Sequence, residues 1–298
     1  MNQTVQIAPI ATAPHLGSRW RVSLWQLSAI GILTIWIYAP ILGKLVVQWW
    51  QDPNFSHGFF VPMFAIYVVW QERSRLSSIP ACPSWTGLVI IAIALCTLIV
   101  GVLGAELFLS RVSLLILLAG LIVLFQGWNY QKALLFPWLF LFLMVPIPAI
   151  VFNQVTFPLQ LLASKVASFA LAAVGVPVLR EGNVIQLPAM PLEVAEACSG
   201  IRSLLSLTTL SIIYGYLMER RIAVRWMLAI ASIPIAVAAN ALRIVGTGLL
   251  VQYWDPEKAE GFFHAFSGWL IFVISLLLLF AVHRSALVIW PDRNRGRS

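Results

Sequence analysis

A cysteine, an arginine and a histidine lie at the ends of three hydrophobic stretches in the second half of the chain. Cys198 precedes one stretch in the run EACSGIR, Arg243 lies near the end of the next, and His264 begins the last. This order predicts that all three lie at one depth on one side of a membrane. A thiolate is a nucleophile, an imidazole exchanges protons near neutral pH, and a guanidinium binds oxyanions. The three side chains therefore predict a site for cysteine-dependent acyl transfer.

The neighbours of Cys198 favour a reactive thiol. Ser199-Gly200 can begin a helix, and the free N–H groups and dipole at a helix N-terminus lower the pKa of a thiol. Glu193 and Glu196 oppose that effect or orient a nearby base. The simpler alternative is a buried cysteine that acts as a small apolar side chain.

Arg243 lies within a hydrophobic stretch that begins near Trp226. A helix would carry it roughly 26 Å from that residue, which is near the outer end of a span. Arginine inside a span costs at least a few kcal/mol and is usually functional or paired. Asn240 precedes it by three residues, shares its helix face and can orient it. The alternatives are snorkelling to the interface or an ion pair with Glu193 or Glu196.

Other polar residues on the same predicted side compete for these roles. His264 is either a proton-transfer group or an interfacial histidine among aromatic residues. His57 is a competing base or, as we favour, a residue that shapes its loop. Arg202 follows Cys198 by four residues, shares its helix face and is the strongest rival to Arg243. One cysteine and two histidines without close ligand spacing do not predict a metal site, and we expect no cofactor.

The composition predicts that these residues lie in a membrane protein. The chain of 298 residues is 60% hydrophobic and 10% charged, against about 25% charged in soluble domains. Its net charge of +8 does not indicate nucleic-acid binding, because the basic residues are dispersed among loops. We expect one membrane domain over residues 1–298, with tails at 1–21 and 285–298.

We expect an all-α polytopic protein with about eight transmembrane helices. Pro137, Pro146 and Pro148 should kink or end the fifth. In residues 158–176, polar residues recur every four positions, which predicts an amphipathic helix on the outer surface. Residues 178–188 predict a small outer β-hairpin. The predicted spans are 24–43, 58–70, 86–105, 112–128, 133–152, 201–217, 226–250 and 262–282.

The positive-inside rule gives this arrangement an orientation. Twelve basic and three acidic residues fall in the N-terminal tail, three loops and the C-terminal tail, whereas the remainder holds seven basic and eight acidic residues. Both termini should therefore be cytoplasmic, and the segment from 153 to 198 should lie outside with the Cys198 site. The predicted location is the bacterial plasma membrane.

The chain resembles the exosortases, bacterial relatives of the archaeosortases. The run around Cys198 is highly specific to this family, and the other matching stretches are a strong signal because they occur in the family's order. The sequences Asp-Pro-Asn and Ala-Glu-Gly-Phe-Phe-His beside them suit a cyanobacterial subfamily. The matching stretches are Ser56-His57-Gly58, Arg180-Glu181-Gly182-Asn183, the run from Glu196 to Ser203, the run from Asn240 to Ile244, and His264 with Ser267-Gly268-Trp269.

The resemblance implies a membrane cysteine transpeptidase or protease. Cys198 would be the nucleophile, Arg243 the essential arginine and His264 the essential histidine, with Arg202, Asn240, Glu196 and His57 as supporting candidates. The implied partners are secreted proteins with a PEP-CTERM signal, which consists of a Pro-Glu-Pro motif, a transmembrane helix and a basic tail. The lipid bilayer is the other expected partner, and nucleic acid is not one. The resemblance implies no particular oligomeric state.

Two other functions remain as alternatives. A transporter or permease for an anionic or lipid-linked substrate would use Arg243 and His264 in its binding site. That class predicts inverted repeats and broken helices near the midplane, and neither is visible in the sequence. A non-catalytic scaffold would leave the energetic cost of Arg243 unexplained.

Overall fold

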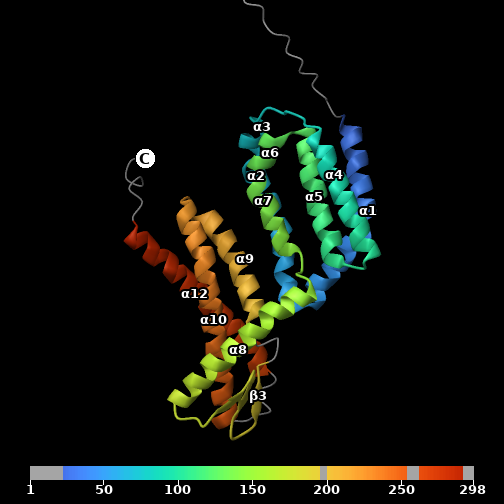
Figure 1. Ribbon diagram of the computed structural model, residues 1–298. Coiled ribbons are helices and arrows are strands. Elements are labelled where there is room, and N and C mark those ends of the chain that lie inside the picture. Colours follow the sequence, from blue (N-terminus) through green and yellow to red (C-terminus); the bar gives the residue numbers. More distant parts are fainter. Residues whose placement is uncertain (1–22, 195–199, 254–261, 291–298) are drawn as a thin grey trace, which may run out of the picture.

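The computed structural model describes residues 23–194, 200–253 and 262–290, with the backbone alone for residue 24 and residues 262–267. It shows a helical protein with one small sheet (Figure 1). Seven of the described helices are long and apolar enough to cross a membrane. The expected class, an all-α multi-pass membrane protein, is confirmed.

The N-terminal helices form one group, on the right in Figure 1. Helices α4 and α5 pack closely because Gly87 has no side chain: a Cβ there would lie 2.4 Å from the backbone nitrogen of Leu124. Small residues allow such close approach of membrane helices. The group consists of α1 (Leu24–Gln51), η1 (Pro53–Phe59), α2 (Phe60–Gln71), α3 (Arg73–Ser77), α4 (Thr86–Leu103), α5 (Leu107–Phe125), α6 (Trp128–Ala133), α7 (Leu135–Phe140) and η2 (Leu141–Met144).

Two of the eight predicted spans form shorter helices. The span predicted at 58–70 is α2, which has only 12 residues. The span predicted at 133–152 is divided among α6, α7 and η2, and the next helix begins after Pro148. Pro146 and Pro148 therefore end this span, whereas Pro137 lies in the first turn of α7. Prolines remove backbone donors and clash with the preceding turn.

Helix α8 (Ala149–Ala173) differs from the surface helix predicted at 158–176. It is one continuous helix of 25 residues, long and apolar enough to cross a membrane, and it runs obliquely from the foot of the N-terminal group toward the lower left in Figure 1. Its expected polar face includes Ser164, which is fully buried and donates to the carbonyl of Gly182 at 2.9 Å. That polar position therefore binds a loop of the sheet.

The predicted hairpin is confirmed and is part of a three-stranded antiparallel sheet. Strands β1 (Leu179–Glu181) and β2 (Val184–Gln186) flank a two-residue turn in which Gly182 has φ +64°, the left-handed conformation that such turns require. The sequence analysis missed the third strand, β3 (Pro191–Glu193), which pairs with β2.

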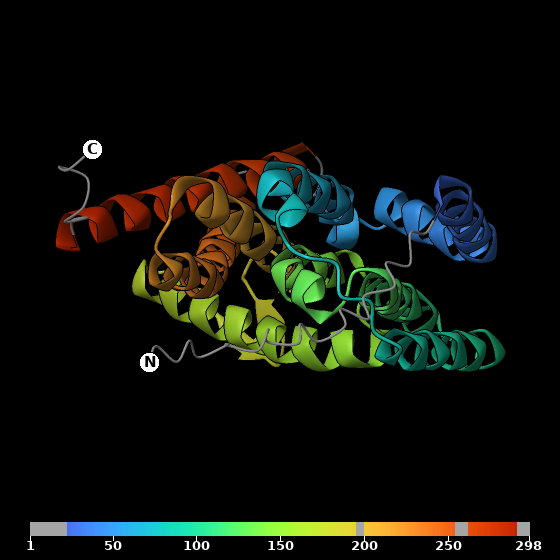
Figure 2. The same cartoon turned by 90° about the horizontal axis from the view of Figure 1, so that it is seen from above.

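The C-terminal helices form the second group and surround α10. Figure 2 shows α8 and α12 on opposite sides of it, and α9 also packs on it. Leu207, Leu228 and Leu279 join the three C-terminal helices in one buried cluster. These helices are α9 (Ile201–Met218), α10 (Ile222–Tyr253) and α12 (Phe262–Ile289).

The two ends of the bundle differ in charge. We call the end at which α2 and α9 end and α10 begins the basic end, and the end that carries the strands the sheet end (Figure 1). The basic residues that were predicted to lie on the cytoplasmic side, as far as the structure describes them, all lie at the basic end. These are Arg73, Arg75, Lys132, Arg220, Arg221, Arg225 and Arg284.

Candidate active site

Arg243 faces helix α12 from the sheet-end half of α10. Its guanidinium approaches Gly268 so closely that a Cβ at residue 268 would lie 3.8 Å from Cζ and 3.9 Å from Nη1. The arginine is half-buried, and its carbonyl accepts a hydrogen bond of 3.0 Å from Thr247. The guanidinium therefore packs against α12 at Gly268, where an alanine would fit and a larger side chain would not.

His264 lies on α12 four residues before Gly268. Residues four apart share a helix face, so the backbone of His264 is one turn from the point that Arg243 contacts. The side chain of His264 lies outside the described part of the molecule. The structure thus brings the segments of two of the three predicted catalytic residues together.

Asn240 joins α10 to the start of α9. Its side chain is 2% exposed, and a Cβ at Gly200 would lie 2.9 Å from its Cγ. Gly200 has φ +84° and precedes the first residue of α9, so the expected helix start at Ser199-Gly200 is confirmed to within a residue. Asn240 is one turn from Arg243, and the same turn of α10 therefore touches the segment that follows Cys198.

Cys198 and Glu196 lie outside the described residues, which resume at Gly200. Two peptide bonds join Cys198 to Gly200. A small cavity of about 10 Å³ adjoins Gly200 and Asn240, between α8, α9 and α10. A space of this size holds at most one water molecule. Gly200, the first described residue after Cys198, is therefore closely packed.

Arg202 and His57 connect the site to the N-terminal group. Arg202 is exposed, and its Nε donates to Oδ1 of Asn54 in η1 at 3.4 Å. His57 is 7% exposed, and its Nε2 lies 3.2 Å from the carbonyl oxygen of Leu143 in η2. Burial lowers the pKa of His57, and its backbone hydrogen bonds oppose that shift. The structure therefore places these two rivals of Arg243 and His264 at the contact between α9, η1 and η2.

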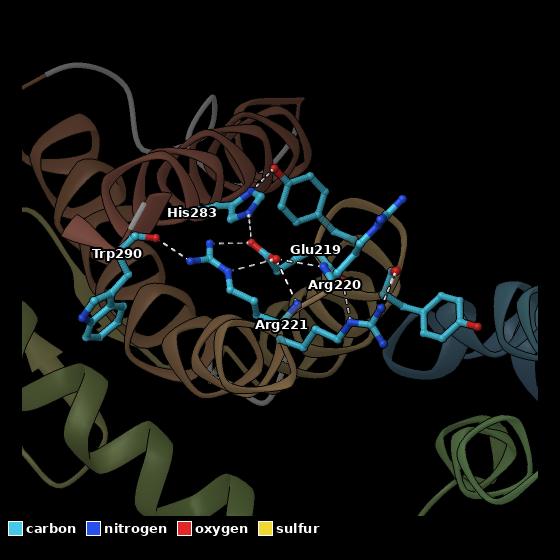
Figure 3. Close-up of polar contacts among 8 residues, drawn as sticks. Glu219, Arg220, Arg221, His283 and Trp290 are labelled. Carbon is cyan, nitrogen blue, oxygen red and sulfur yellow. Dashed lines mark hydrogen bonds and ion pairs between the residues drawn. The ribbon is translucent and has the colours of Figure 1, made fainter. Parts of the chain in front are cut away.

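The sequence analysis missed a polar cluster at the basic end, shown in Figure 3. The Glu219 carboxylate accepts from Arg221 Nη2 at 2.9 Å and from the backbone N–H groups of Arg220 and Arg221 at 2.8 and 3.0 Å. It also lies 3.6 Å from His283, whose Nδ1 is 2.8 Å from the Tyr214 hydroxyl. The Arg221 hydrogen bonds lower the pKa of Glu219 to about 2. The loop was interpreted only as a topology signal, although its charge pattern is visible in the sequence.

A second missed residue is Arg111, which is 3% exposed within α5. A charged residue in an otherwise apolar run was a signal that could have found it. Among the residues with described side chains, no group of three or more histidine, cysteine or carboxylate side chains could hold a metal ion.

The comparison with known families identifies the family of the chain. Residues 49–281 match the model of the family described as transmembrane exosortase (Exosortase_EpsH), a range that includes Cys198, Arg243 and His264. No curated protein and no solved structure matches the chain. The match covers well over half of the sequence and extends from the end of α1 into α12. The chain therefore belongs to the transmembrane exosortase family, whose general role is that of a membrane transpeptidase.

Proposed function

We propose that the protein is a cysteine transpeptidase that cleaves PEP-CTERM-type sorting signals of secreted proteins. The observation that carries this proposal is the convergence of three segments at the sheet end. Arg243 contacts α12 at Gly268, one turn from His264, and Asn240 on the same helix contacts Gly200, two residues after Cys198. The reactive groups of an acyl-transfer site thus belong to neighbouring segments.

The proposed reaction begins when the Cys198 thiolate attacks the scissile carbonyl carbon. Arg243 stabilises the resulting oxyanion, an effect worth up to a few kcal/mol in a site of low dielectric constant. The C–N bond breaks, the leaving amine takes a proton from His264, and a thioester remains. An amine or water then attacks the thioester carbon and loses its proton to His264. The C–S bond breaks, and the thiolate leaves as the new acyl product forms.

The proposed orientation places the basic end in the cytoplasm and the sheet end at the outer face. A secreted protein anchored by its own C-terminal helix would then present its Pro-Glu-Pro motif beside the sheet and the start of α9. Arg180 and Arg202 are both exposed there and would bind the glutamate of the motif. Asn240 would position Arg243 and the Cys198 loop.

The test is processing of a reporter that ends in a Pro-Glu-Pro motif, a transmembrane helix and a basic tail. The reporter is co-expressed with wild type or with Cys198→Ala, and its size is followed on a gel. Cys82→Ala and Cys96→Ala are matched controls, because both cysteines are exposed and lie on other segments. We expect Cys198→Ala alone to abolish the shortened product. Equal processing by this variant would overturn the nucleophile assignment and favour the transporter alternative.

A further inference from the structure

A cavity of about 600 Å³ lies between the two helix groups in the basic half of the molecule. Its volume is within the range of small-molecule binding sites, and it is far from the sheet-end site. Most lining side chains are aliphatic or aromatic. It is lined by Val68, Val69, Glu72 and Arg75, by residues of α6, α7 and η2 from Ala133 to Leu143, and by Ile212, Tyr216, Ile222, Arg225, Trp226 and Ala229.

The wall of this cavity continues onto the lipid-facing surface. Leu139 of α7 is 50% exposed and Trp226 of α10 is 66% exposed, and both line it. Opposite walls approach where the rings of Phe136 and Tyr216 stack at 4.8 Å. An apolar chain in the bilayer therefore has a side entrance to an apolar space.

The polar side chains of the cavity carry a net positive charge. Arg75 and Arg225 line it together with one carboxylate, Glu72. Arg225 is held in place: its guanidinium lies 4.8 Å from the centre of the Tyr216 ring, and its Nε donates to the Glu219 carbonyl. Arg75 is exposed and lies 3.5 Å from Glu72. One fixed and one adjustable guanidinium therefore adjoin an apolar space.

We propose that this cavity binds an anionic phospholipid of the cytoplasmic leaflet. An acyl chain packs against Leu139 and Trp226, and the phosphate binds Arg75 and Arg225. Basic pockets between membrane helices on the cytoplasmic side bind anionic headgroups. The substrate's transmembrane helix is a poorer occupant, because its basic tail would meet the same two arginines. The proposal uses the orientation proposed above but does not depend on the Cys198 nucleophile.

The experiment is native mass spectrometry of the purified full-length protein, titrated with phosphatidylglycerol or with phosphatidylcholine of identical chains. We expect tighter binding of phosphatidylglycerol to wild type. Arg75→Gln should weaken it about fivefold, the loss expected for one basic residue near an anionic surface. Arg73→Gln is the matched control, because Arg73 stacks on Trp70 and does not line the cavity.

A second pair of variants tests the location. Ala229→Phe places a bulky ring in the cavity and should weaken binding of phosphatidylglycerol, whereas Ala223→Phe, on the same helix but outside the lining, should leave it unchanged. Equal affinity for both lipids, or equal binding by the two phenylalanine variants, would overturn the proposal. Capture of the reporter's transmembrane helix by a photo-crosslinker at Leu139 would also overturn it. Because none of these readouts uses peptide cleavage, failure here is distinct from failure of the proposed transpeptidase.

Discussion

Asn240 and Gly200 are in such close contact that no side chain fits between them. A Cβ on Gly200 would lie 2.9 to 3.0 Å from three atoms of the Asn240 side chain, and Gly200 has a left-handed backbone. Because Gly200 precedes α9 and Asn240 lies one turn from Arg243, this contact fixes the start of one helix against the middle of another. Cys198 precedes Gly200 by two residues in the chain.

Gly200→Ala should therefore abolish reporter processing. The left-handed backbone costs an alanine about 1–2 kcal/mol, and the new Cβ must displace Asn240 as well. Gly175→Ala is the matched control, because Gly175 has φ +86° and open space around it. Both variants should lose some thermal stability in detergent from backbone strain, Gly200→Ala the more because its Cβ also displaces Asn240, but only Gly200→Ala should lose processing. Equal processing by the two variants would contradict a positioning role for this contact.

Substitutions at Gly268 should depend on size. Gly268→Ala places its Cβ at an ordinary contact distance from Arg243 and should retain processing, since alanine also favours a helix. Gly268→Leu should displace the guanidinium and reduce the processing rate at least about tenfold, which corresponds to about 1.4 kcal/mol of transition-state stabilisation. Gly246→Leu on α10, where nothing lies within 4 Å, is the control. A fully active Gly268→Leu variant would show that processing does not need the Arg243 guanidinium at this position.

Arg180 and Arg202 should contribute to recognition of the substrate's glutamate. The Arg180→Ala, Arg202→Ala double variant should process the Pro-Glu-Pro reporter several-fold more slowly, because exposed charge pairs are worth up to about 1 kcal/mol each. A reporter with Pro-Gln-Pro removes the partner charge. The double variant should therefore affect this second reporter much less. Equal slowing of both reporters would assign the two arginines a structural role.

Glu219 should make stability depend on pH. Its folded-state pKa of about 2 lies below the unfolded value of about 4.3. Its contribution is therefore complete at neutral pH and is lost as the pH falls from about 5 toward 2. The shift corresponds to roughly 3 kcal/mol.

Thermal unfolding in detergent checks this prediction at pH 7 and pH 3. Glu219→Gln should lower the melting temperature at pH 7, and the difference from wild type should shrink on acidification. Glu193→Gln, which changes an exposed residue of β3, should have little effect. A pH-independent difference for Glu219→Gln would exclude the carboxylate charge as the stabilising factor.

Local signals in the sequence predicted much of this structure. Composition and the lengths of the apolar runs indicated the membrane class, Gly182-Asn183 indicated the hairpin turn, and Pro146 and Pro148 marked the end of a predicted span. Each of these features depends on neighbouring residues alone. Charge pattern grouped the loops correctly at one end of the bundle.

Features that depend on packing were not predictable in the same way. The contact of Arg243 with Gly268 joins two helices, and nothing local to either residue specifies it. The burial of Ser164 reverses its expected exposure, because the turn between β1 and β2 provides a carbonyl acceptor that periodicity cannot reveal. The cavity arises from two short, interrupted helices beside two long ones. Prediction of the thiol, guanidinium and imidazole roles came from residue type and family resemblance.

The contact between Arg243 and Gly268 also has a consequence for biosynthesis. The ribosome makes the start of α9 first, then α10, and then α12, and the two contacting residues are 25 positions apart in the chain. At about 5–20 residues per second, Gly268 follows Arg243 by about 1 to 5 s. Until His264 is added, 21 residues after Arg243, a nascent chain holds the proposed nucleophile and the arginine without the histidine. The order of synthesis therefore delays assembly of the complete site until helix α12 has reached α10.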